Sequence, residues 1–572
     1  MTNTVINTHF NSLFRASILF VCVFALMEFA EYAIAGRFIG CYSLAGMQLV
    51  SPTLTFFTFV SIMLTSGTMT LYSYAVGRAD RYDANGWYSQ GVIMCVIVGL
   101  IISVGMMALT NFMTAWPDIP QETLSYAYGY YMGIVPRPLF YFLDYLLMGV
   151  LMTEGKSSLC VKSAVVQLFL NIVLGILLCQ TWDIYGLSLA ATISIVVSVM
   201  IKATYLLDKT CPLKFRFHIK PSELSRVCGF SLYSALQPLM QMLMIIVTTK
   251  YILQNFGAET LVIYSIVLKI IALGTSISDA VTEAMQPMVC VYHAEGNYVG
   301  VHKIMRHSMR TGLKAELCLM LILLIGSPFL PGLFGVTEPE MVGETTYAIC
   351  LCLLSLPLFL FVHVNTYCYI YTERRQYALL LQPILIFVAP VASMMLLGAA
   401  AVQDRLWFYA TLAYALAALT NIIMTLVVTR QSNGTYSGLW LSDTKKMARQ
   451  LAYDCMSSAT EITKISQQAQ RDLTALGVSS GKTNKVAVLI EDMGLLSADN
   501  STRCPMPIEV TLICDGDSPK LIMRSIGQTH DVTDDDMQPL SFRQYFTSQM
   551  ITALDKENYL LLGKENRTVI KI

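Results

Sequence analysis

The feature that most constrains this chain is a series of twelve apolar runs, each long enough to cross a lipid bilayer as a helix. A spanning helix needs about 20 mostly apolar residues, and only helices or closed barrels satisfy every backbone polar group inside lipid. The sequence therefore predicts an all-α polytopic membrane protein with twelve transmembrane helices. In chain order the runs lie at 13–36, 46–76, 88–111, 125–152, 160–180, 185–207, 228–254, 260–291, 308–335, 343–372, 377–400 and 406–429.

A change of composition after the last run predicts a separate soluble domain. The chain is 55% hydrophobic and 13% charged, whereas soluble domains are about 25% charged, yet the apolar runs stop after Arg430. The predicted division is a first six-helix lobe at 1–207, a cytoplasmic inter-lobe loop at 208–227, a second six-helix lobe at 228–430, a linker at 431–440 and an α+β soluble domain at 441–572.

Basic residues gather in alternate loops, and this bias predicts the orientation of the helices. One set of loops holds most of the Lys and Arg, and the opposite set holds mainly Asp and Glu. Because short loops rich in Lys and Arg stay in the cytoplasm, we expect a multi-pass protein of the cell membrane with both termini cytoplasmic. The few cations of the opposite loops are Arg37, Arg137 and Arg405.

The two sets of six runs share features at a nearly constant separation. Thr153 and Thr372 each precede a Glu and lie 219 positions apart, and Pro136 and Pro357 lie 221 positions apart. An offset of six spans preserves orientation, so the pattern predicts two parallel repeats. Their axis would run along the membrane normal, with substrate sites between them near the midplane.

Several motifs resemble one family of transporters. The segment "EYAIAGRFIG" at 31–40, "SYAVGRADRYDAN" at 73–85 and "EAMQPMV" at 283–289 are similar to segments of multidrug and toxic compound extrusion (MATE) transporters. The resemblance covers about residues 10–430. It implies a two-lobed exporter of organic cations and related drugs, driven by inward sodium or proton flow. Such a protein is not an enzyme and uses no cofactor beyond the coupling ion.

Ionisable residues inside the first six runs are candidates for ion coupling, because a charge within a span is costly. Glu31 lies where the resemblance implies a carboxylate, normally Asp, although a Glu that merely reaches interfacial water is the alternative. Asp144 lies midway along the fourth run and could share a cation site with Glu31 or bond to a neighbouring helix. Asn171 matches a polar position of the family, but Gly175 replaces the carboxylate expected four residues later.

The second six runs hold a looser set of candidates. Asp279 and Glu283 lie four residues apart, on one helix face, and either take part in coupling or pair with Lys250 or Lys269. His363 fits a proton relay or a buried histidine bonded to backbone. The predicted cation-coupling and substrate residues are Glu31, Asp144, Asn171, Asp279, Glu283, His363 and Asn365. The 15 cysteines form no CxxC pair, so neither a metal site nor a disulfide framework is predicted.

The soluble tail reads as a mixture of helices and strands. Helical periodicity extends over 443–470, strands are predicted at 508–516 and 520–527 around an Asp-Gly turn, and 558–572 reads as a closing hairpin. This order resembles the histidine-kinase-type (GHKL) ATPase fold in its anti-sigma-factor-like form.

The nucleotide-binding positions implied by that second resemblance are not filled. Leu495 and Leu496 stand where the magnesium-binding Asn is expected, Ser525 replaces the adenine-binding Asp, and 539–550 has no Gly-rich lid. We therefore expect a degenerate domain that binds a protein partner or regulates transport.

Two further functions compete with drug export. A flippase for lipid-linked saccharides, from the same wider superfamily, would require a cationic cavity and usually has extra helices. A membrane-anchored signalling protein would act through the tail. The expected partners are the lipid bilayer and a small organic cation, and no nucleic acid is indicated.

Overall fold

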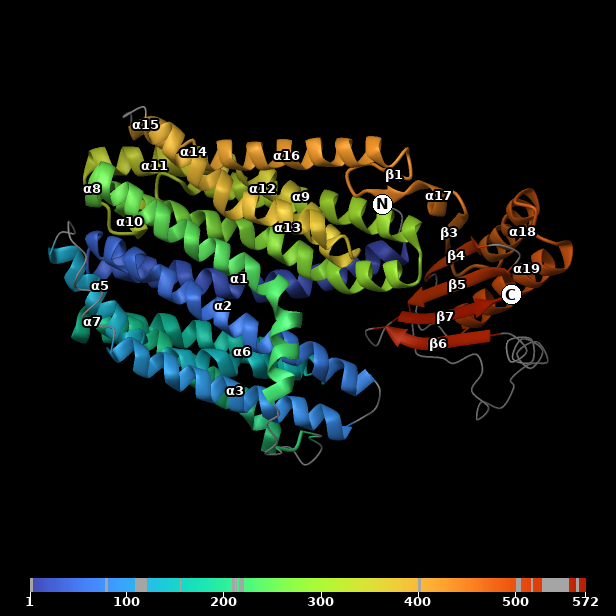
Figure 1. The fold of residues 1–572 in the computed structure, drawn as a ribbon, viewed down its shortest axis with the longest axis horizontal. Coiled ribbons are helices and arrows are strands. Elements are labelled where there is room, and N and C mark those ends of the chain that lie inside the picture. Colours follow the sequence, from blue (N-terminus) through green and yellow to red (C-terminus); the bar gives the residue numbers. More distant parts are fainter. Residues whose placement is uncertain are drawn as a thin grey trace.

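The structure is a computed structural model in which a body of long helices carries a small α+β domain at one end (Figure 1). The N-terminus lies at that same end of the body. We refer to this end as the tail side, and to the opposite one as the far end. The structure describes residues 4–77, 81–108, 121–154, 156–207, 211, 213–215, 221–399, 403–499, 506–515, 518–526, 555–561 and 565–572.

The helices of the first half form the lower group in Figure 1 and those of the second half the upper group, except that the start of α8 crosses into the lower group. The first half comprises α1 (Val5–Phe38), α2 (Tyr42–Gly77), α3 (Arg81–Ala108), α5 (Gln121–Ile134), α6 (Arg137–Thr153), α7 (Ser157–Ala203) and η1 (Thr204–Leu207). The second half comprises α8 (Pro221–Ala294), α9 (Tyr298–Gly326), α10 (Leu330–Leu333), α11 (Pro339–Leu353), α12 (Leu356–Tyr371), α13 (Arg375–Pro383), η2 (Ile384–Val388), α14 (Ala389–Gly398), α15 (Gln403–Leu406) and α16 (Tyr409–Gln431).

Two of these helices reverse direction within their bounds. α7 has non-helical backbone at Trp182 and Asp183, and α8 has it at Gly257, with φ of +87°. In α8 the Tyr264 hydroxyl donates to Thr248 Oγ1 at 2.8 Å, although 16 residues of straight helix would separate them by about 24 Å. Each therefore supplies two antiparallel segments.

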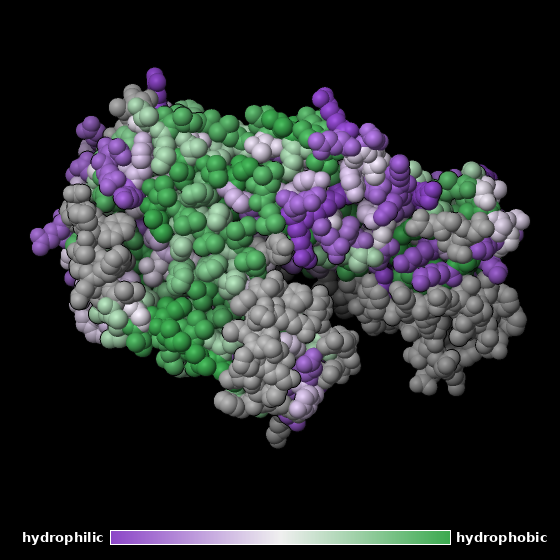
Figure 2. Space-filling model, viewed as in Figure 1, coloured by the Kyte–Doolittle hydropathy of each residue, from purple (hydrophilic) through white to green (hydrophobic). Residues whose placement is uncertain are grey.

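Eight helices of the described chain are long and apolar enough to cross a membrane, or nine if the bent pair α5 and α6 is one span. Large apolar side chains cover the sides of the body, and Figure 2 shows this green surface between polar ends. The exposed residues include Ile101, Val104 and Met107 on α3, Leu321, Ile322 and Ile325 on α9, and Leu419, Ile423 and Leu426 on α16. An apolar surface of this extent suits contact with lipid.

The helix α1 packs against both halves. Near its middle, Val23 and Met27 pack with Ala164 of α7. Its tail-side part, through Phe10 and Phe14, belongs to an apolar cluster with α8, α9 and α12. The first helix of the first half is therefore anchored to the second half at its tail side.

At the far end, α1 meets the segment that follows α9. Gly36 and Gly335 lie backbone against backbone, because a Cβ on either would overlap main-chain atoms of Phe334 or Gly36. Phe29 stacks edge-on against the Phe334 ring, with centroids 5.1 Å apart. Only glycines permit so close an approach.

Two of the expected spans are broken at matching places. α5 and α6 meet at an angle of 54°, with Pro136 as the N-cap of α6. α11 and α12 are likewise separated at Leu354 and Ser355, and Pro357 is the second residue of α12. Helices interrupted at corresponding positions of two halves point to a binding site near the membrane centre.

The tail begins with a short two-stranded ribbon and continues as a five-stranded antiparallel sheet of order β3-β4-β5-β7-β6. Its helices α18 and α19 cover one face of the sheet, where Val510, Leu512, Leu521 and Met523 point. The tail elements are β1 (Tyr436–Ser437), β2 (Ser442–Asp443), α17 (Thr444–Met447), β3 (Gln450–Met456), α18 (Ala459–Ala475), α19 (Ser480–Asp499), β4 (Pro507–Asp515), β5 (Ser518–Ile526), β6 (Asp555–Leu561) and β7 (Glu565–Lys571).

The predicted strands and closing hairpin of the tail are present, but the helix predicted over 443–470 is wrong in its first part. Residues 450–456 form β3, which pairs with β4 from Gln450 opposite Ile513 onward. Pairing with β4 and burial of Tyr453 and Cys455 against the helices override the local periodicity. The segment 539–550, for which the sequence predicts no Gly-rich lid, lies outside the described residues.

Candidate functional site

The break between α5 and α6 brings charged side chains together inside the helical body. Arg137 is the first residue of α6, and its Nε and Nη1 atoms are buried without a hydrogen-bond partner in the described chain. We expected Arg137 in a far-end loop. Instead Pro136 breaks the span and places the guanidinium within it.

Glu31 of α1 lies beside this break and is buried, with 5% of its surface exposed. The Tyr130 hydroxyl, from the last turn of α5, donates to Glu31 Oε1 at 2.6 Å. Arg137 acts electrostatically on both Glu31 and Glu28. The site is thus assembled from α1, α5 and α6, and its carboxylate is held by a neutral hydroxyl near a cation.

A second pair extends the cluster into the other half of the molecule. Lys269 of α8 donates to Glu28 Oε2 at 2.9 Å, and its ammonium lies 4.5 Å from the centre of the Tyr32 ring. The Glu28 side chain remains 63% exposed. Arg137, Glu31, Glu28 and Lys269 therefore form one cluster of two acids and two bases, which we call the lobe cluster.

Asp144 takes a different partner from the one considered first. Lys202 near the end of α7 lies 2.8 Å from Asp144 Oδ2, and both side chains are largely buried. Asp144 therefore bonds to a neighbouring helix, and a cation site shared with Glu31 stays a prediction. Asn171 is buried on α7. Gly175, one turn further, faces Ile34, which lies 3.3 Å from where its Cβ would be, so a carboxylate there would press on α1.

In the second half, His363 of α12 lies with Nε2 3.0 Å from Asp279 Oδ1 on α8. This pair replaces the expected ion pair between Asp279 and a lysine of α8, since Lys269 binds Glu28. Glu283 follows one turn after Asp279 on α8. Asn365 is buried, and neither amide atom has a hydrogen-bond partner in the described chain.

Sequence reasoning missed four charged residues of these sites: Glu28, Arg137, Lys202 and Glu316. Glu316 on α9 is fully buried and accepts a hydrogen bond from Ser278 Oγ at 3.4 Å. Glu28 precedes Glu31 by three residues and so shares its helix face, a signal that was available. Arg137 directly follows a proline within an apolar run, which was also a signal.

The described residues hold no group of three or more His, Cys, Asp or Glu side chains arranged to bind a metal.

Comparisons with known proteins agree with this architecture. The MatE family model matches residues 16–177. The fold is similar to that of an inward-facing multidrug resistance MATE transporter of the MOP superfamily, with TM-score 0.66 and 17% identity over 72% of this chain and 96% of that one. It is also similar to a MOP-superfamily transporter from Pyrococcus furiosus, with TM-score 0.63 and 17% identity over 76% and 97% of the two chains.

A curated relative is the uncharacterized membrane protein EpsK of Bacillus subtilis, 22% identical over 304 residues. The match spans 51% of this chain and 59% of EpsK. The chain therefore has the fold of the MATE transporters, and part of its first half matches the MatE family model.

Proposed function

We propose that the protein is a cation-coupled antiporter that works by alternating access between two lobes, residues 1–207 and 228–430. To the nine candidate spans the reversals in α7 and α8 add one crossing each. We count α9 as the twelfth crossing, although its tail-side turns are charged. The proposal places the protein in the cell membrane with the tail side in the cytoplasm, in keeping with the basic loops.

The observation that carries the proposal is Glu31, a buried carboxylate of the lobe cluster that lies beside the break between α5 and α6. A carboxylate that accepts one hydroxyl bond has lone pairs left for a proton or a sodium ion. Loading or unloading that ion would change the charge beside Arg137 and Lys269. It would thereby alter the attraction between α1 and α8, which come from different lobes. Asn171, Asp279, Glu283, His363 and Asn365 remain proposed contributors to ion or substrate binding.

The Glu31→Gln variant tests this proposal. In proteoliposomes with an imposed sodium or proton gradient, we expect gradient-driven efflux of a cationic dye to fall by at least about tenfold. The Glu259→Gln variant, at the far end of the α8 reversal, serves as the matched control. Wild-type efflux in Glu31→Gln at equal expression would contradict the proposal.

The substrate class has a second candidate, a lipid-linked saccharide. The buried guanidinium atoms of Arg137 favour it, because such substrates carry phosphates that arginine binds. The likeness to the Pyrococcus furiosus transporter, described as having a binding pocket of reverse polarity that suggests a different function, is in keeping with a substrate other than an organic cation. Arg137→Gln separates the two: it should abolish movement of a phosphorylated lipid and spare that of a cationic dye.

We propose that the tail is a degenerate GHKL-like domain without ATPase activity. Leu495 packs into the core between sheet and helices, and Ser525 is buried in β5. Neither can supply the amide or carboxylate that a magnesium nucleotide would need. Titration of the purified protein with ATP and magnesium should show no micromolar binding. Micromolar binding would favour the third candidate, a signalling protein that acts through its tail.

A further inference from the structure

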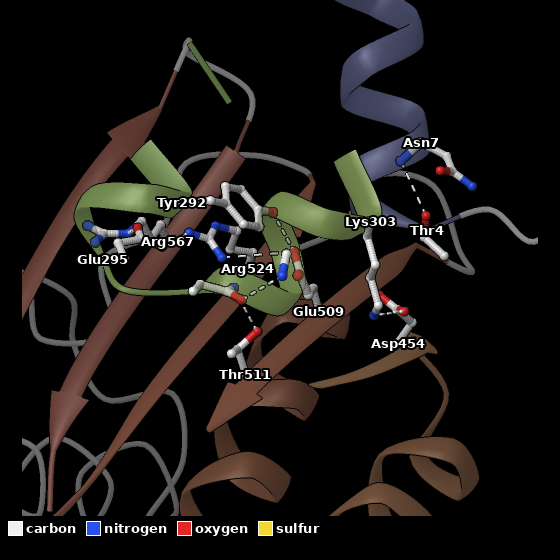
Figure 3. Close-up of polar contacts among 12 residues, drawn as sticks. Thr4, Asn7, Tyr292, Glu295, Lys303, Asp454, Glu509, Thr511, Arg524 and Arg567 are labelled. Carbon is white, nitrogen blue, oxygen red and sulfur yellow. Dashed lines mark hydrogen bonds and ion pairs between the residues drawn. The ribbon is translucent and has the colours of Figure 1, made fainter. Parts of the chain in front are cut away.

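The sheet of the tail has a second face that none of its own described helices covers. Glu509 and Thr511 of β4, Arg524 of β5 and Arg567 of β7 point to this face, opposite the apolar residues that meet α18 and α19. All four are nevertheless buried, with at most 3% of their surface exposed. What covers them is the turn between α8 and α9, residues 292–303, which we call the α8–α9 turn (Figure 3).

Four charges meet where the turn touches the sheet. Glu295 of the turn forms ion pairs with both Arg524 and Arg567, and Arg524 Nη1 lies 3.9 Å from Glu509 Oε2. The cluster of two acids and two bases is neutral as a whole, and we call it the tail cluster. Buried charges of this kind are tolerated only when they are paired, so the two surfaces match in charge as well as in shape.

Tyr292 of the α8–α9 turn contacts two members of the tail cluster. Its hydroxyl donates to Glu509 Oε2 at 2.5 Å, and the Arg524 guanidinium lies 3.8 Å from the centre of its ring. Burial raises the pKa of the Glu509 carboxyl, while Arg524 and the Tyr292 hydroxyl act in the opposite direction. The charged form of Glu509 therefore depends on partners from both sides of the junction.

Polar contacts continue along the turn. Gly296 has φ of +79°, a conformation that suits glycine, and its carbonyl accepts a hydrogen bond from the Gln450 side chain. Gln450 Oε1 in turn accepts from the Val299 backbone at 3.1 Å. Asn297 donates to Thr511 at 3.2 Å. At the rim, Lys303 pairs with Asp454 at 2.7 Å.

The start of α1 lies at the same junction. Thr4 caps the helix by accepting a hydrogen bond from the Asn7 backbone, and the first turn approaches β4 and β5. Val5 and Ile6 there are at most 2% exposed. Ile6 also joins the apolar cluster of α8, α9 and α12. The tail and the second half of the body thus enclose the first turn of α1 together.

We propose that the uncovered face of the tail sheet is a docking surface for the α8–α9 turn, and that the docked tail clamps the start of α1 against the second half of the body. The partner of this surface is the chain itself. The surface carries these charges beside an apolar group, Ile513, Ile522 and Val569, and such a mixture of polar and apolar contacts is typical of interfaces that form and separate. The proposal rests on the junction and holds for any transported substrate.

Cysteine reporters in the full-length protein, held in lipid nanodiscs, test the docking. Thr511→Cys reports on the docking surface and Val5→Cys on the start of α1. Gln468→Cys, on the exposed face of α18, is the accessible control. Native Cys455 lies between the sheet and its helices and reports on unfolding of the tail. Maleimide labelling of each site is followed by peptide mass spectrometry.

In an otherwise native chain, the thiols of Thr511→Cys and Val5→Cys should label at least about tenfold more slowly than that of Gln468→Cys, since they are buried by tertiary contact. Glu295→Arg places a third cation among Arg524 and Arg567 and should bring both sites close to the control rate, with Cys455 still protected. Adding Arg524→Glu restores two acids and two bases and should restore protection.

Two results would overturn the proposal: rapid labelling of Thr511→Cys in the native background, or protection that persists in Glu295→Arg. If Glu295→Arg also exposes Cys455, the tail has unfolded, and the rim swap Lys303→Asp with Asp454→Lys becomes the test. Each single variant, Lys303→Asp or Asp454→Lys, should then label Thr511→Cys faster than the double variant does. Equal labelling rates in the two single variants and the double variant would count against docking.

Discussion

The lobe cluster and the tail cluster are built from the same parts, two acids and two bases, yet their settings differ. The tail cluster is sealed, with side chains of Glu295, Arg524 and Arg567 at most 3% exposed. In the lobe cluster the Glu28 side chain is 63% exposed and Lys269 is 15% exposed. A sealed cluster holds two surfaces in one arrangement, whereas an open one keeps water and ions within reach and can change partners.

The largest effect should follow removal of one base from the sealed cluster. Arg524→Ala leaves Glu295 and Glu509 facing each other without their shared cation, a change that typically costs about 3–5 kcal/mol in a buried pair. We expect the tail to leave the α8–α9 turn, measured as faster maleimide labelling of Thr511→Cys. Arg471→Ala, an exposed arginine of α18, is the control. Equal labelling in both variants would show that the cluster does not hold the junction.

A change in the open cluster should affect transport more than stability. Lys269→Met removes the cation between Glu28 and Tyr32 but keeps the length of the side chain. Because Glu28 is mostly exposed, we expect the free energy of unfolding to fall by less than about 1 kcal/mol. The shift in the midpoint of thermal unfolding measures this loss. Gradient-driven efflux should fall about tenfold, because the attraction between α1 and α8 is lost.

Lys250→Met, which alters an exposed lysine on the same helix, should leave both quantities unchanged. Strong destabilisation in Lys269→Met with unaltered efflux of the folded fraction would reverse the contrast between the two clusters.

The smallest effect is expected at the rim of the tail junction. Lys303 and Asp454 are 35% and 27% exposed, so Lys303→Ala should weaken docking by about 0.2–1 kcal/mol. Raising the salt concentration from about 0.1 to 1 M shortens the screening length from about 10 to 3 Å. It should reproduce the rim effect in the native protein and add little to Lys303→Ala. A large salt effect in the variant would mean that the tail cluster is also open to ions.

The helical body could be predicted from the sequence because its signal is local. Long apolar runs mark the helices, and Glu31 and Asp144 stand out as charges within them. Pro136 and Pro357, 221 positions apart, mark the repeat. The break beside each of them was not predicted, because both runs were expected to be continuous helices.

The partners of the charges could not be predicted, because they are distant in sequence. Lys269 meets Glu28 across 241 positions, and Arg524 meets Glu295 across 229. No local pattern records such pairings, which depend on how the two halves and the tail come together. The strand β3 was missed for the same reason, since its pairing with β4 outweighs its helical periodicity.

The contact between Gly36 and Gly335 has a consequence for the far end of the body. Main chain touches main chain there, so no side chain can swing aside to let a molecule pass. A molecule could pass at this point only if α1 or the segment after α9 moved as a whole. A single methyl group added at Gly36 would keep the two backbones apart.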